Sequence, residues 1–461
     1  MSRTGRRIGL LLAAVALLAY GARQCWALEI KRTVLDNGAV LLVSEQHQLP
    51  MVTVSIAFDA GARRDPAEKA GLANLTAASL SEGTRQLSAE QLNQKIDFMG
   101  SSLGVDAGRD YASANCVSLA RYFHETLGLL ASVLTEPALR DDDIMRKKAE
   151  HIAALRSAEE EPGYVARRTF TELLFDHQPY GHLPSGDIDS VEKLTSADVR
   201  AFYHAHYRAG SAVIAVVGDV EAGQLHAELE HDLAKLKGAV PPQPEPETPQ
   251  MPAGAHLTTI DRNVTQANIA LGFSGIARSN PDYYRLQVMN YILGGGGFAS
   301  RLVKVVRAKQ GLAYSVASIF SAGKFPGSFE VVLQTKNSSA NEAVKLVLEQ
   351  LRKIQAQPVS QADLESAKRF LIGSFPLKLD RQSAIANFLI QVELYGLGLD
   401  YADKYPKLID AVTVSDVQGA AQRYLHPDSY ILVAVANQKE AALHVPGQTA
   451  RDAGRGGSAE R

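Results

Sequence analysis

The segment that decides the fold is Asn290–Val316, which reads Asn-Tyr-Ile-Leu-Gly-Gly-Gly-Gly-Phe-Ala-Ser-Arg-Leu-Val-Lys-Val-Val-Arg-Ala-Lys-Gln-Gly-Leu-Ala-Tyr-Ser-Val. Four consecutive glycines, Gly294–Gly297, interrupt an apolar helix that we expect to begin near Asp282. A second, basic helix should follow and end at Gly311, and a strand should begin at Ala313. Glycine lets another backbone approach closely. The segment therefore predicts a glycine-hinged face that binds an extended peptide.

The charge around this segment supports the same interpretation. Between Tyr283 and Phe329 the chain has six Lys or Arg residues and no Asp or Glu. Unopposed positive charge favours carbonyl or carboxylate partners. The residues expected to contact a substrate here are Gly294, Gly295, Gly296, Gly297 and Phe298.

Outside this segment, the chain repeats its own order of elements around a proline-rich stretch. Residues 239–254 contain six prolines and form an extended linker in our interpretation. Before it, a helix predicted from Ser196 leads to the apolar strand Ala212–Val217. After it, the similar segment from Val412 leads to the apolar strand Tyr430–Val435. Such self-similarity indicates an internal duplication.

Local signals predict further elements. Asp36-Asn37-Gly38 is a hairpin turn signature. The alternation over Val52–Phe58 predicts a strand. Ser88 followed by Gln91 predicts a capping box at the start of a helix, and a long helix is expected from Asp141 to about Glu160.

The N-terminus has the pattern of a secretory signal. Arg3, Arg6 and Arg7 precede the apolar run Ile8–Tyr20, whose 13 residues fall short of the ~20 needed to span a membrane. Cleavage is expected near Ala27, so the mature protein would be periplasmic or secreted, without a membrane anchor. The expected organisation is a signal peptide (1–27), an N-terminal peptidase-like domain (28–238), the linker (239–254), a C-terminal domain (255–445) and a disordered tail (446–461).

Composition argues against nucleic-acid binding and against a disulfide. The predicted signal contains four Arg and no acidic residue, so its removal changes 48 basic and 50 acidic residues to 44 and 50, a net charge near −6. A mildly acidic chain has no general affinity for nucleic acid. Cys116 would be the only cysteine left, which excludes an intramolecular disulfide.

A family resemblance starts in Asp59–Thr84, which reads Asp-Ala-Gly-Ala-Arg-Arg-Asp-Pro-Ala-Glu-Lys-Ala-Gly-Leu-Ala-Asn-Leu-Thr-Ala-Ala-Ser-Leu-Ser-Glu-Gly-Thr. This segment resembles the pitrilysin/insulinase (inverzincin) metallopeptidase family, which includes the mitochondrial processing peptidase. The resemblance spans about residues 30–440. Further matches, in the family's order, are Gly108–Tyr111, His177–Gly181, Val216–Asp219, Leu293–Gly297 and Arg307–Val316.

The chain departs from the family where the family binds zinc. After Gly-Leu-Ala the family has His-x-x-Glu-His, which supplies two zinc ligands and a general base. Here those positions are Asn74, Ala77 and Ala78, and the position of the third ligand falls at Ala154. Alanine has no lone pair to donate, and catalytic zinc needs three protein ligands. The resemblance therefore implies no metal or other cofactor in this chain.

Two other family residues are retained. In the family, an Arg and a Tyr seven residues later reach the zinc site from the C-terminal half, and Arg307 and Tyr314 keep that spacing. The resemblance implies that Arg307 holds a substrate carbonyl and that Tyr314 donates a hydrogen bond to the developing oxyanion.

The resemblance also implies a fold and a partner. The expected fold class is α+β, with two homologous halves that form a clamshell. Each half would be a pair of related α/β units with antiparallel sheets and helices on one face. Some bacterial members divide the zinc motif and the Arg–Tyr pair between two chains. This chain is similar to the non-zinc subunit, so zinc is expected on a homologous partner and a peptide is the expected substrate.

Two questions stay open at this stage. A catalytically inactive pseudopeptidase that binds peptides by strand addition, or that serves as a structural subunit, is the alternative function. The retained Arg–Tyr spacing favours the catalytic subunit over this alternative. The sequence also leaves open whether the isolated chain forms a homodimer.

Overall fold

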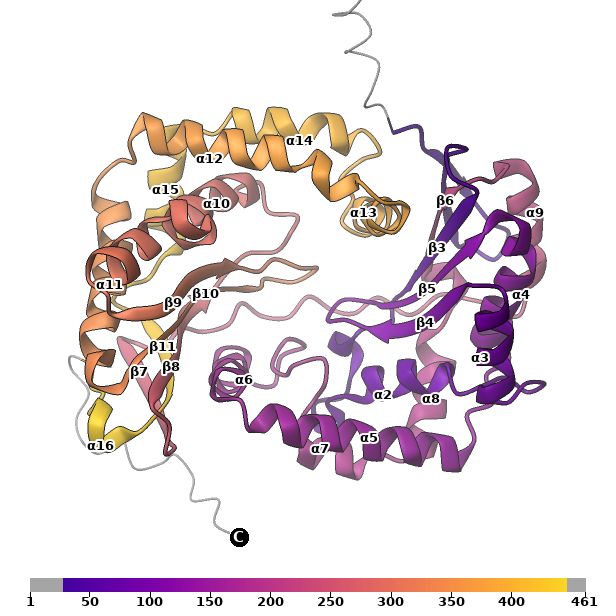
Figure 1. The fold of residues 1–461 in the computed structure, drawn as a ribbon, viewed down its shortest axis with the longest axis horizontal. Coiled ribbons are helices and arrows are strands. Elements are labelled where there is room, and N and C mark those ends of the chain that lie inside the picture. The colour runs from indigo at the N-terminus through magenta and orange to yellow at the C-terminus, as the bar shows by residue number, and fades with distance from the viewer. Residues whose placement is uncertain (1–27, 446–461) are drawn as a thin grey trace, which may run out of the picture.

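The computed structural model describes residues 28–445, so the predicted signal peptide (1–27) and C-terminal tail (446–461) lie outside the described residues. Two sheets stand side by side, one built from each half of the chain, with helices around them (Figure 1). In residues 28–445, no helix combines the length and apolar character needed to cross a membrane.

The sheet of the N-terminal half has six strands in the order β1-β2-β6-β3-β5-β4. They are β1 (Lys31–Val34), β2 (Val40–Glu45), β3 (Met51–Phe58), β4 (Ser102–Ala107), β5 (Ala112–Leu119) and β6 (Val213–Gly218). The sheet of the C-terminal half has five strands in the order β7-β11-β8-β10-β9. They are β7 (Ala255–Asp261), β8 (Gln266–Ser274), β9 (Ala313–Phe320), β10 (Ser328–Lys336) and β11 (Tyr430–Ala436).

The two sheets have the same topology, which agrees with an internal duplication. Without β1, strands β2-β6-β3-β5-β4 match β7-β11-β8-β10-β9 one by one. In each half the last strand pairs in parallel with the first, and the other pairs are antiparallel. The expectation of antiparallel sheets was therefore wrong, because the helices between the first and last strands form a long crossover connection. The described residues of each half contain one mixed sheet rather than a pair of units.

Helices of each half cover one face of its own sheet, where the two largest apolar cores lie. The helices of the N-terminal half are α2 (Leu72–Leu80), α3 (Ala89–Phe98), α4 (Phe123–Thr135), α5 (Asp141–Glu159), α6 (Pro162–Phe175), α7 (Ile188–Lys193), α8 (Ser196–His206) and α9 (Ala222–Asp232). Those of the C-terminal half are α10 (Tyr283–Asn290), α11 (Ala340–Ala356), α12 (Gln361–Ser374), α13 (Gln382–Leu394), α14 (Tyr401–Asp410), α15 (Val414–Tyr424) and α16 (Gln438–Ala441).

The opposite face of each sheet is covered by a helix from the other half. Helix α6 packs Phe170 and its apolar neighbours on β8 and β11, and α13 packs Leu389 and its neighbours on β3 and β6 (Figure 1). The expectation of helices on one face only was incomplete for this reason. Because each half supplies a helix to the other's core, neither sheet can stay buried on both faces alone.

A half-buried carboxylate joins the halves at the turn between β9 and β10. Asp110, in the turn between β4 and β5, accepts hydrogen bonds from the Tyr395 hydroxyl (2.8 Å), the Lys324 backbone N–H (2.9 Å) and the Tyr180 hydroxyl. Burial raises the pKa of Tyr180 and of Tyr395. A Cβ at Gly323 would come within 2.6 Å of the Asp110 carboxylate, so a larger residue there would displace the side chains of this contact.

Residues 239–254 contain no helix or strand and are held by both halves. The Gln243 side-chain amide donates to the Arg63 carbonyl (2.8 Å), and the Arg64 guanidinium donates to the Pro241 carbonyl (3.0 Å). At the other end, the Ser429 hydroxyl donates to the Pro252 carbonyl. The segment therefore lies along the surface of both halves.

The helix exchange predicts that both halves unfold together. Leu389→Ala removes a fully buried side chain from the contact between α13 and the N-terminal sheet, and should lower the free energy of unfolding by about 2–5 kcal/mol. Urea titration followed by circular dichroism should show one transition, shifted to lower urea. Leu377→Ala, at a side chain that is 72% exposed, is the control and should change little. Two separate transitions would contradict this account.

Candidate functional site

The glycine-rich segment takes a less regular path than the two helices expected from the sequence. Helix α10 ends at Asn290 and continues into a π-helical turn, Tyr291–Gly295. A short 3₁₀ turn, Gly297–Ala299, leads to a second π-helical segment, Val303–Lys309. Strand β9 then begins at Ala313, as predicted. Wide π-helical turns are rare and often occur at functional sites.

Close packing explains why the glycines are needed. A Cβ at Gly294 would lie 2.5 Å from the backbone nitrogen of Ser318 on β9, so only glycine lets the turn approach the strand. Gly295 and Gly296 pack equally tightly on Asn290 and Tyr291. Gly297 has a φ of +56°, which favours glycine. The glycines thus hold the turn against the strand that carries Tyr314.

Tyr314 occupies an irregular position in an edge strand. The pairing of β9 with β10 places Ser315 opposite Gln334 and Ala313 opposite Thr335, and the register shifts between them. Tyr314 is therefore an extra residue with no partner in this ladder. A bulge of this kind re-aims a side chain, and the Tyr314 side chain is 54% exposed. Since β9 is the last strand of its sheet, this edge has no neighbouring strand within residues 28–445.

Arg307 and Phe298 come together beside the glycines. The Arg307 guanidinium carbon lies 5.3 Å from the centre of the Phe298 ring, which is within the range of a cation–π contact. Phe298 is 80% exposed, and Arg307 is exposed as well. No ion pair is formed by Lys304, Arg307 or Lys309 in the described chain. The segment therefore presents an exposed aromatic ring and unpaired positive charge.

The four positions that carry the zinc ligands and general base in related peptidases lie on two neighbouring helices. Helix α2, with Asn74, Ala77 and Ala78, packs beside α5, which carries Ala154 (Figure 1). Asn74 and Ala78 are half-buried, Ala77 is buried and Ala154 is exposed. Three methyl groups and one amide do not fit a zinc ion. In residues 28–445, no cluster of three or more His, Cys, Asp or Glu side chains could hold a metal.

The acidic and basic groups around α2 have other roles. The Asp65 carboxyl group accepts from the backbone N–H groups of Gly71 (2.9 Å) and Ala73 (2.8 Å), and so caps α2. Burial raises the pKa of Asp65 to about 8. Burial also lowers the pKa of His182 and lowers that of His206 to about 4, so these imidazoles are neutral at pH 7. Asp65 therefore caps the helix, and these groups form no ligand set in the described chain.

The structure does not bring all the sequence-predicted residues into one place. Arg307, Phe298 and Tyr314 belong to the glycine-rich segment and β9 in the C-terminal half. In Figure 1, α2 and α5 lie in the N-terminal half, across the molecule from β9. Sequence reasoning missed the bulge at Tyr314 and the stacking of Arg307 on Phe298. No local sequence pattern indicates the bulge. Phe298 beside four glycines, by contrast, was a sequence signal for an exposed aromatic side chain.

Comparisons with known proteins agree with these features. The family described as Insulinase (Peptidase family M16) matches residues 40–183. A second family, described as Peptidase M16 inactive domain, matches residues 193–371. The two matches together extend from residue 40 to residue 371, in both halves of the chain.

Relatives match over nearly the whole chain. The chain is 27% identical to the non-peptidase homolog YmxG of Helicobacter pylori, over 87% of this chain and 92% of that protein. It is 25% identical to a probable mitochondrial-processing peptidase subunit beta of Arabidopsis thaliana, over 88% and 78%. The crystal structure of a peptidase M16 inactive domain from Pseudomonas fluorescens superposes with a TM-score of 0.83 and 30% identity, over 89% of this chain and 98% of that one.

The geometry of α2 predicts the zinc content of the protein. The purified chain should contain no stoichiometric zinc by elemental analysis, because residues 28–445 contain no set of side chains that could bind a metal ion. The double variant Asn74→His/Ala78→His should gain weak zinc binding in a calorimetric titration. Positions i and i+4 are neighbours on a helix face, and both side chains are half-buried rather than enclosed. Stoichiometric zinc in the unmodified chain would contradict the interpretation of these positions.

Proposed function

Because the chain belongs to the peptidase M16 (insulinase) family, we propose that it is the non-zinc subunit of a heterodimeric zinc metallopeptidase that cleaves extended peptides. The partner is a homologous chain with an intact zinc motif, and the complex is periplasmic. The Arabidopsis relative is named as a subunit of a processing peptidase, which supports a multi-chain enzyme. In this proposal the two halves close like a clamshell, and the partner completes the peptide-binding chamber.

One contrast within the chain supports this proposal most strongly. The positions on α2 and α5 that would bind zinc hold Asn74 and three alanines. By contrast, Arg307 and Tyr314 are retained, exposed and held in place by the glycine-rich segment and the bulge. Exposed catalytic groups without their own metal centre are consistent with a site completed by another chain.

Each retained side chain has a role that its chemistry allows. The Arg307 guanidinium is a planar set of donors that can bind a substrate carbonyl, and Phe298 supports it from one side. The Tyr314 hydroxyl can donate to the oxyanion that develops at the scissile carbonyl. Gly297, where an added Cβ would meet no atom within 4 Å, leaves open space for a peptide backbone beside them.

A pseudopeptidase is the second candidate, and the edge strand β9 favours it. The open edge of β9 can accept an extended peptide by strand addition without catalysis. The chain also resembles a protein named as a non-peptidase homolog. The two candidates differ in one respect: only the catalytic subunit needs the Tyr314 hydroxyl and the Arg307 guanidinium.

The proposal predicts the effect of removing these groups. Peptide cleavage should require both this chain and the zinc-motif homologue. Tyr314→Phe should lower kcat roughly 100- to 1000-fold, because one oxyanion donor is lost. Arg307→Ala should mainly raise KM, because a substrate contact is lost. Turnover is measured with a quenched fluorescent peptide, and complex formation by analytical ultracentrifugation.

Two control variants separate catalysis from charge and folding. Lys309→Ala removes an exposed cation from the same π-helical segment, and Tyr122→Phe removes a hydroxyl in the other half. Both should leave turnover nearly unchanged. If Tyr314→Phe and Arg307→Ala also leave turnover unchanged while the complex still forms, the catalytic role is wrong and the pseudopeptidase is favoured.

A further inference from the structure

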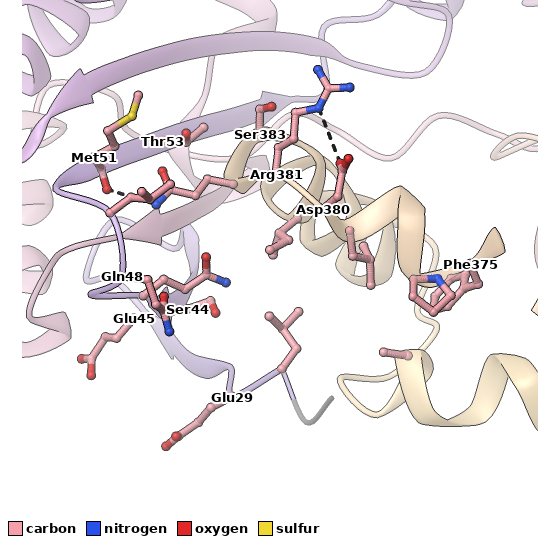
Figure 2. Close-up of a pocket in the computed structure, with 18 of the residues that line it drawn as sticks. Glu29, Ser44, Glu45, Gln48, Met51, Thr53, Phe375, Asp380, Arg381 and Ser383 are labelled. Atoms are coloured by element: carbon pink, nitrogen blue, oxygen red, sulfur yellow. Dashed lines mark hydrogen bonds and ion pairs between the residues drawn. The ribbon is translucent and has the colours of Figure 1, made fainter. Parts of the chain in front are cut away.

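A large cleft lies between the halves, away from the glycine-rich segment. It encloses about 1060 Å³ and is lined by the ends of β2 and β3 on one side and by the segment 375–383 on the other (Figure 2). It contains none of Phe298, Arg307 or Tyr314. Its volume lies at the upper end of the range of small-ligand sites.

The cleft exists because α13 does not cover the whole face of the sheet. Ser44 on β2 and Thr53 on β3 both pair with Val217 on β6, so their side chains share a row on the face that α13 covers. Helix α13 begins at Gln382, whose side-chain amide donates to the Met51 carbonyl (3.2 Å). The last row of the sheet therefore stays open to the cleft.

Two hydroxyl groups in this row have no hydrogen-bond partner within residues 28–445. Ser44 is 2% exposed and Thr53 is 3% exposed, and both line the cleft. Figure 2 shows them on the sheet side of the cleft, facing the segment that carries Asp380, Arg381 and Ser383. Both oxygens reach the open space of the cleft, so both are available to a polar ligand there.

The start of α13 adds donors to the same cleft. No side chain caps this helix, and the backbone N–H groups of Gln382, Ser383 and Ala384 have no partner in the described chain. The 13-residue helix also directs the positive end of its dipole there. A carboxylate fits such a helix end. Arg381 lies beside it and pairs with Asp380 at 3.5 Å.

Negatively charged side chains lie at the rim of the cleft, and the floor of the cleft is apolar. Glu29 and Asp403 line the cleft and form no ion pair in the part of the chain that the structure describes. Phe375, Leu379 and Ile385 supply apolar surface between the polar groups. A ligand with a carboxylate, an ammonium group and apolar side chains would satisfy all three features.

We propose that this cleft between the halves binds the free carboxyl-terminal segment of a short peptide. The peptide carboxylate contacts the first turn of α13, and the hydroxyls of Ser44 and Thr53 bond to the peptide backbone. Apolar side chains rest on Phe375 and Leu379, and an ammonium group faces Glu29 and Asp403. The site is separate from the proposed active face and does not depend on it.

Calorimetric titration of the purified protein with the hexapeptide Lys-Ala-Leu-Ala-Phe-Leu tests this site. The free acid should bind at least roughly tenfold more tightly than its C-terminal amide, because the helix end favours a carboxylate. Ser383→Asp should weaken binding of the acid by a similar factor, since the new charge competes for the same N–H groups. Thr53→Val, which keeps the side-chain shape, should weaken it several-fold.

A matched variant and two further titrations complete the test. Ser415 is also an exposed serine at the second position of a helix, α15, outside the cleft, so Ser415→Asp should leave peptide binding unchanged. Tyr122→Phe, at a residue outside both the cleft and the proposed active face, should also leave it unchanged. Equal affinity for acid and amide, no binding at millimolar peptide, or no effect of Ser383→Asp would overturn the proposal. Displacement of the peptide by laurate would assign the cleft to a lipid acid instead.

Discussion

The exchange of one helix between the halves is the constraint on which the rest of the structure depends. Helix α6 covers the C-terminal sheet and α13 covers the N-terminal sheet, so each sheet is buried on both faces. Asp110 strengthens this contact by bonding two tyrosines and the turn between β9 and β10. Because that turn follows β9, the exchange also fixes where Tyr314 lies relative to the N-terminal half.

Two separate features of the fold leave open the two faces to which we assign binding. On one side, the edge of β9 is left open, and the glycine-rich segment packs against this strand through Gly294. On the other side, α13 is too short to cover the row of Ser44 and Thr53, which leaves the cleft between the halves. A duplicated fold that has lost its metal ligands can therefore still present two peptide-sized surfaces.

The sequence was sufficient for local elements and for the duplication, but not for contacts between the halves. The capping box of Ser88 and Gln91 forms as predicted, and β9 begins at Ala313. The apolar runs of β6 and β11 were recognised, yet their burial on both faces was not inferred, although unbroken apolar strands indicate it. The bulge at Tyr314 depends on pairing with a distant strand, so no local pattern could reveal it.

A photo-crosslink from position 314 tests the central claim most directly. Tyr314 would be replaced by benzoylphenylalanine, and the complex with the zinc-motif homologue would be irradiated and analysed by mass spectrometry. The account predicts a crosslink to the zinc-motif helix of the partner chain, because Tyr314 is exposed on an open edge far from this chain's own α2. A crosslink to α2 of the same chain, or none to the partner in a complex that has formed, would contradict it.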